Sequence, residues 1–180
     1  MKEENVPKTA REDHAKIAKG MNTFIPKHVV RSHMLRLNDR PKAIFGLFDP
    51  IGEKKWSEEW NPNMIFLAST ISQGTVFTTK NKEGPDTIWI ITELNKEHCK
   101  IAYTAVTPAF RVTLIEISCD PDGSSHTKAH VTYAITALSE DGNRYVDSFS
   151  EEHYQKWMIG WETAINHYLQ HGSPMKHHKH

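Results

Sequence analysis

The middle of the chain alternates between apolar and polar residues in short runs that are rich in Ile, Val, Thr and aromatic residues. Such runs are typical of strands that bury one face and expose the other. Six of them are present, at residues 64–69, 75–80, 87–94, 99–106, 110–118 and 127–138. Short links containing Gly, Pro, Asn or Asp separate the runs, and no helical periodicity interrupts them. The pattern therefore predicts six strands in an antiparallel meander.

A further strand and two short helices are predicted before this meander. Residues 27–37 mix apolar and polar positions in the manner of a half-exposed strand. Helices are expected over residues 41–48 and 53–56. Asp39 can cap the first helix, and Pro41 suits its first turn.

A long helix is predicted at the end of the ordered chain, over residues 148–171. Ser150 can cap its start, and Gly172 can end it. One apolar stripe at helical spacing contains Phe149, His153, Trp157, Trp161, Ala164, Ile165 and Tyr168. The preceding Asp141-Gly142-Asn143 is interpreted as a turn. The stripe should pack against one face of the sheet, which predicts an α+β fold with seven antiparallel strands around the helix.

The two ends of the chain have a different composition from the middle. Residues 1–22 are highly charged and are predicted to be a mobile segment, and residues 173–180 to be a disordered His-rich tail. Residues 23–172 are then expected to form a single domain, which is long enough to bury a sizeable core.

Charge and cysteine content exclude several classes of protein. The chain has 22 Lys and Arg against 22 Asp and Glu, so it lacks the basic excess that binds nucleic acid or anionic membranes. Its two cysteines are too few for a disulfide framework. No apolar run is long enough for a membrane span, and the first residues do not form a secretory signal. We therefore expect a cytoplasmic protein with reduced thiols and no stable membrane insertion.

Several local sequences resemble a known superfamily. They are the predicted strand followed by RPKAIF at residues 40–45, the segment KWSEEWNP at residues 55–62, and the aromatic-rich helix over residues 154–168. Residues 27–170 resemble the START and birch-pollen-allergen-like helix-grip superfamily (SRPBCC), and especially its polyketide cyclase/dehydrase-like and chaperone-ATPase-activator-like branches. The resemblance implies a helix-grip fold with a hydrophobic cavity between sheet and helix, and it leaves the content of the cavity open.

Aromatic residues are the candidate ligand-binding residues in such a cavity. The set consists of Trp60, Phe66, Trp89, Tyr103, Phe110, Tyr133, Trp157 and Trp161. Each of them can equally belong to an ordinary core. Trp56 and Trp60 either form the lip of the cavity or seal the open end of the sheet. The entrance is expected near Trp60 and the Gly84-Pro85 turn.

The first functional hypothesis is a binding protein for a small hydrophobic molecule, such as a lipid, an isoprenoid or a polyketide-like aromatic compound. It is expected to need no cofactor and to be a monomer or a weak homodimer. A second hypothesis is a cyclase, dehydrase or hydrolase that acts on a similar molecule. A third is an interaction protein of the chaperone-activator type, with a filled core and an exposed apolar patch on the outer sheet surface.

Catalysis would need an acid or base inside the cavity. Glu93, Glu116 or Tyr133 can take that role if they point inward, and each carboxylate can equally lie on the solvent face. Arg111 and Arg36 can pair with these acids or bind a ligand carboxylate. No sequence motif of a known catalytic centre is present.

The twelve histidines do not predict a native metal site. His177, His178 and His180 lie in the tail, and His167 and His171 are four residues apart on the last helix. No carboxylate or cysteine is placed to complete a site around them.

Overall fold

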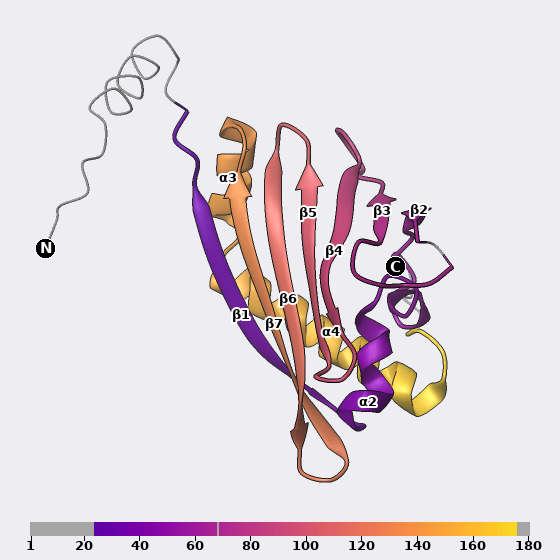
Figure 1. Ribbon diagram of the computed structural model, residues 1–180. Helices are drawn as coiled ribbons and strands as arrows, with labels where there is room; N and C mark the ends of the chain where they lie inside the picture. Colours follow the sequence, from indigo (N-terminus) through magenta and orange to yellow (C-terminus); the bar gives the residue numbers. More distant parts are fainter. Residues whose placement is uncertain (1–23, 68, 176–180) are drawn as a thin grey trace, which may run out of the picture.

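A computed structural model describes residues 24–67 and 69–175. Its main element is a seven-stranded antiparallel sheet in the order β1-β7-β6-β5-β4-β3-β2 (Figure 1). The strands are β1 (His28–Leu37), β2 (Asn63–Phe66), β3 (Val76–Thr79), β4 (Thr87–Asn95), β5 (Lys100–Thr107), β6 (Arg111–Asp122) and β7 (His126–Ala137). The predicted meander is confirmed, and the first strand pairs with the last.

The predicted short helices follow β1, and the long helix ends the fold. The helical elements are α2 (Pro41–Ile44), the 3-10 turns η1 (Phe45–Phe48) and η2 (Glu53–Lys55), α3 (Glu140–Ser148) and α4 (Glu151–His171). Figure 1 shows α4 crossing one face of the sheet. The predicted α+β helix-grip arrangement is therefore confirmed. Asp39 does not cap α2, because its side chain accepts a hydrogen bond from Arg40 N instead.

The predicted turn at residues 141–143 is wrong, because these residues form the first half of α3. The side chain of Ser139 caps this helix by accepting from the backbone N–H of Gly142. Gly142 is needed for close packing, since a Cβ atom there would collide with the carbonyl oxygen of Phe110. The long helix consequently begins later than predicted, at Glu151, with Ser150 as its N-cap.

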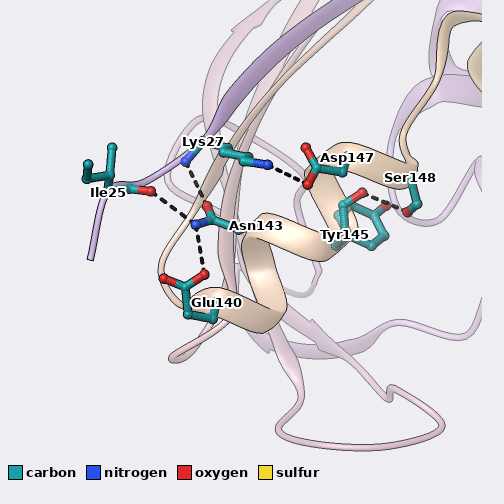
Figure 2. A network of polar contacts seen from close by, with 7 residues as sticks. All are labelled: Ile25, Lys27, Glu140, Asn143, Tyr145, Asp147 and Ser148. Carbon is teal, nitrogen blue, oxygen red and sulfur yellow. Dashed lines mark hydrogen bonds and ion pairs between the residues drawn. The ribbon is translucent and has the colours of Figure 1, made fainter. Parts of the chain in front are cut away.

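Asn143 shows why α3 is fixed in place (Figure 2). Its buried side chain accepts a hydrogen bond from Lys27 N at 2.8 Å and donates one to Ile25 O at 3.0 Å. Both partners belong to the segment that leads into β1. Lys27 also forms an exposed ion pair with Asp147 on the next turn of α3.

The link predicted between the strands at residues 110–118 and 127–138 is shorter than expected. Asp120, Pro121 and Asp122 continue β6, where Pro121 lies opposite Thr127 and Asp122 opposite His126. Pro121 is exposed. The β6–β7 hairpin is therefore longer than the alternation of apolar residues indicated.

The inner face of the sheet packs on α4 as the strand pattern predicted. On β7 the buried set is Ala129, Val131, Tyr133, Ile135 and Ala137. The predicted stripe on α4 is only partly right. The buried residues of this helix are Tyr154, Met158 and Ile165, of which only Ile165 belongs to the stripe, and His153 of the stripe is exposed. Trp157, which belongs to the predicted stripe, is 37% exposed.

The predicted N-terminal segment of residues 1–22 and residues 176–180 of the predicted tail lie outside the described residues. Among the helices that are described, none is both long and apolar enough to cross a membrane.

Candidate functional site

A cavity of about 370 Å³ lies between the inner face of the sheet and α4. Pockets that bind small molecules typically have volumes of about 300–1,000 Å³. An apolar cavity of about 150 Å³ already holds one benzene molecule. The cavity therefore has room for a molecule with two rings.

Six of the eight predicted ligand-binding residues line this cavity. They are Trp60, Trp89, Tyr103, Tyr133, Trp157 and Trp161. Phe110 does not line it and instead packs its ring edge-on against Tyr145. Phe66 is also absent from the lining and is 59% exposed on the edge strand β2, because a bulge after Met64 shifts its register against β3.

The aromatic rings form two walls. In the first wall Phe77 on β3 stacks on Trp89 on β4, and Trp60 packs edge-on against both. The second wall joins β7 to α4, with Tyr133 and Trp157 centroids 5.0 Å apart and Trp157 and Trp161 centroids 5.5 Å apart. Edge-to-face packing of this kind holds the rings in fixed positions.

Hydrogen bonds to the protein fix the first wall further. The indole N–H of Trp60 donates to Pro50 O at 2.9 Å, and that of Trp89 donates to the Thr79 hydroxyl at 2.9 Å. The Tyr103 hydroxyl donates to Phe48 O at 2.7 Å. Because these polar groups already have hydrogen-bond partners in the protein, the three residues present mainly their apolar ring surfaces to the cavity.

The two tryptophans of the 55–62 segment have different places. Trp60 lines the cavity, whereas Trp56 is buried against Trp161 and lies behind the wall. Of the two tryptophans, only Trp60 therefore belongs to the cavity lining, and Trp56 belongs to the core. Gly84 and Pro85 do not line the cavity, which instead reaches solvent beside the exposed residues Glu59 and Trp157.

Glu53 is a cavity residue that the sequence analysis did not identify. It lines the cavity from η2, and its carboxyl group has no hydrogen bond or ion pair with any residue of 24–67 or 69–175. Burial raises the pKa of Glu53 to about 8, so the group is mostly neutral at pH 7. Burial is also the main reason why the pKa values of the Tyr103 and Tyr133 hydroxyls are raised, and the charge of Glu53 raises both further.

A tight local structure holds Glu53 at this position. The side chain of Asp49 accepts hydrogen bonds from Ile51 N at 2.9 Å and Gly52 N at 2.7 Å. The carbonyl of Asp49 accepts from Glu53 N at 2.9 Å. Gly52 packs so closely on Gly46 O that a Cβ atom there would collide with it. The Asp49-to-Gly52 spacing was the available sequence signal for this turn.

The carboxylates proposed for catalysis do not reach the cavity. Glu93 and Glu116 are both exposed, because the strand register places each beside Ala102 on the outer face of the sheet. Arg36 is exposed as well. Arg111 does line the cavity, and its guanidinium lies 4.0 Å from the centroid of the Tyr145 ring.

The described residues contain no cluster of three or more His, Cys, Asp or Glu side chains that could hold a metal ion. The rings of His167 and His171 are 4.4 Å apart, and His177, His178 and His180 lie outside the described residues. Burial raises the pKa of the Cys119 thiol to about 12, which makes it a poor nucleophile.

No family model matches the chain, and no curated protein matches it. Solved structures match over most of its length. Norcoclaurine synthase from Thalictrum flavum is 13% identical, with 84% of this chain and 99% of that chain covered and a TM-score of 0.60. Ara h 8.0201 is 11% identical, with 80% and 99% covered and a TM-score of 0.57.

The chain shares the helix-grip fold of these two solved structures. The Mll3558 protein from Rhizobium loti also shares this fold, at 14% identity, 79% and 98% coverage and a TM-score of 0.52. The resemblance seen in the sequence is thereby confirmed at the level of the fold. One structure of the norcoclaurine synthase contains dopamine and hydroxybenzaldehyde.

Proposed function

We propose that this helix-grip protein binds a small, largely apolar molecule with one or two aromatic rings in the cavity between sheet and α4. The observation that carries this proposal is the aromatic lining of a cavity of about 370 Å³. Aromatic rings pack well against the edges and faces of other rings, so the lining suits a planar ligand better than a flexible acyl chain.

The energetics support binding by burial. A ligand that buries about 250 Å² of apolar surface gains roughly 6 kcal/mol before the cost of association. The walls are already held by hydrogen bonds and ring contacts, so little ordering is needed when the ligand enters. The aromatic molecules in the norcoclaurine synthase structure support the idea that this fold can enclose such ligands.

The two alternative functions have less support. An interaction protein was expected to have a filled core, and the cavity does not fit that expectation. The enzyme hypothesis loses Glu93 and Glu116, which are both exposed. Glu53 faces the cavity, but a reaction would need a second positioned group and a known substrate.

The test compares native and denaturing mass spectra of the purified protein, together with one variant that fills the cavity. Ala105 on β5 lines the cavity, and Ala105→Phe should occupy part of its volume. Ala102→Phe is the matched control, because Ala102 lies on the same strand and faces the other side of the sheet.

A bound molecule that is released on unfolding, retained by Ala102→Phe and lost by Ala105→Phe is the expected result. If nothing co-purifies, the protein is titrated with naphthalene and benzophenone in a thermal-shift assay. No shift with either compound, or equal retention by both variants, would overturn the proposal.

A further inference from the structure

Two polar groups that face the cavity have no partner in the protein. The carboxyl of Glu53 and the hydroxyl of Tyr133 make no hydrogen bond with the described residues, including each other. Tyr133 lies on the inner face of β7 and is only 6% exposed. Among the described residues no fully buried side-chain N or O atom lacks a hydrogen-bond partner, so these two groups are reached through the cavity and are available to a ligand.

The neighbouring polar groups differ in this respect. Tyr103 donates to Phe48 O, and Thr87 shares a hydrogen bond of 2.8 Å with Thr107. Glu53 lies close enough to Tyr133 for its charge to act on that hydroxyl, although the two are not hydrogen bonded. Both residues line the same cavity, so one bound ligand can contact both groups.

The other charges of the cavity decide which ligand atom fits. The ionisable groups in the lining, apart from Glu53, are Glu59 of the following loop, Tyr103 on β5, Arg111 on β6, Tyr133 on β7 and Tyr145 on α3. Helix α4 contributes the neutral Trp157 and Trp161. Arg111 is half-buried and has no ion pair with the described residues, whereas Glu59 is exposed. The positive charge of Arg111 therefore favours an electron-rich ligand group over a cation in the less exposed part of the cavity.

We propose that the ligand carries a hydrogen-bond-accepting oxygen, carbonyl or phenolic, on its aromatic body, and that this oxygen lies between the Glu53 carboxyl and the Tyr133 hydroxyl. Both groups donate a hydrogen bond to it. A neutral carboxylic acid beside a tyrosine hydroxyl is an established way to hold a partly negative oxygen in an apolar site. This inference rests on the proposed function and names the class of ligand.

The experiment compares benzophenone with 1,1-diphenylethylene, in which a CH₂ group replaces the carbonyl oxygen. Both molecules have the same two rings and nearly the same shape, so the ratio of their dissociation constants reports the oxygen alone. The ratio is measured by calorimetry on the full-length protein below pH 8, where Glu53 is mostly protonated. Benzophenone should bind more tightly by roughly fivefold for each hydrogen bond.

Three variants assign the effect to the two donors. Tyr133→Phe should reduce the preference for benzophenone roughly fivefold. Tyr154→Phe is the matched control, because its buried hydroxyl donates to Val131 O and does not line the cavity, so the ratio should not change. Glu53→Gln keeps an N–H donor and should keep the preference.

The pH dependence provides an independent readout. Above pH 8 the ionised Glu53 no longer donates and repels the carbonyl oxygen, so the wild-type preference should fall. Glu53→Gln has no proton to lose and should bind with the same preference at both pH values.

The possible failures are distinguishable. If both molecules bind the wild type with equal affinity, the cavity binds aromatic ligands and only the proposed oxygen site is wrong. If the Tyr133→Phe ratio equals that of the wild type, the site is wrong as well. If neither molecule binds, the proposed function fails together with this inference.

Discussion

At the scale of the residue, Gly52 is a position where the fold accepts no side chain. A Cβ atom there would collide with Gly46 O, and the displacement would move the adjacent Glu53. We expect Gly52→Ala to lower the free energy of unfolding by about 1–3 kcal/mol, as overpacking does elsewhere. Urea unfolding followed by tryptophan fluorescence measures the change.

Gly46→Ala is the control for this prediction. Gly46 has no atom within 4 Å of the position that a Cβ would take, so the variant should keep its stability. Equal stabilities of the two variants would show that the loop can shift to accept a side chain at residue 52.

Glu53 makes stability depend on pH in an unusual direction for a carboxylate. Its pKa is about 8 in the folded protein because of burial, against 4.5 for an ordinary glutamate. The folded state therefore holds an additional proton between these pH values, and the stability from Glu53 is lost as pH rises from 4.5 to 8. Glu53→Gln should be more stable than the wild type at pH 8.5 by about 2–4 kcal/mol, and the gain should vanish near pH 4.

Denaturant titrations of the wild type and Glu53→Gln across this pH range provide the measurement. Glu58→Gln removes an exposed carboxylate five residues away and should follow the wild type at every pH. A difference between wild type and Glu53→Gln that does not vary with pH would mean that Glu53 is hydrated in the folded protein.

At the scale of the element, α3 depends on Asn143. This side chain satisfies two backbone groups before β1, and replacing it leaves both without their partner. We expect Asn143→Ala to cost about 2–3 kcal/mol of stability in chemical unfolding. Asp147→Ala, on the same helix, removes only an exposed ion pair with Lys27 and should cost less than about 1 kcal/mol. A comparable cost for both variants would contradict the role of Asn143.

The sequence predicted elements well where one periodicity dominates. The alternation along β7 identified its buried face, and Gly172 marked the end of α4. Ser150 was recognised as a cap, although the helix was predicted to begin two residues before it. The prediction from sequence was wrong where a residue that is common in turns serves close packing within a helix instead. Gly142 allows a close approach to Phe110 O, and its helix was interpreted as a turn.

The cavity was expected only because the resemblance implies one, and six of the eight aromatic residues proposed for it line it. Its acid was not. Alternation can assign a strand residue to a face, but Glu53 lies in a 3-10 turn of three residues that has no periodicity to read. Its orientation depends on the hydrogen bonds of Asp49 and the contact of Gly52, which only the folded structure brings together.

At the scale of the whole molecule, the sheet is uneven. Strands β6 and β7 each have twelve residues and a partner on both sides, whereas β2 has four residues and pairs with β3 alone, across a bulge. The β2–β3 end should therefore open locally at a lower free energy than global unfolding. This end carries Phe77 of the first aromatic wall, so we expect its opening to disrupt the cavity.

Hydrogen exchange of the free and benzophenone-saturated protein tests this expectation. Without ligand, amides of β3 should exchange faster than those in the centre of β6. A ligand that binds only the closed cavity should slow exchange by the same factor for every opening that destroys the site, hence at both β3 and β6. Amides at the far end of the β6–β7 hairpin, near Gly123, can open while the cavity stays intact, so their exchange should not change. If ligand slows β6 but not β3, the β2–β3 end opens without releasing the ligand, and this end is not needed to close the cavity.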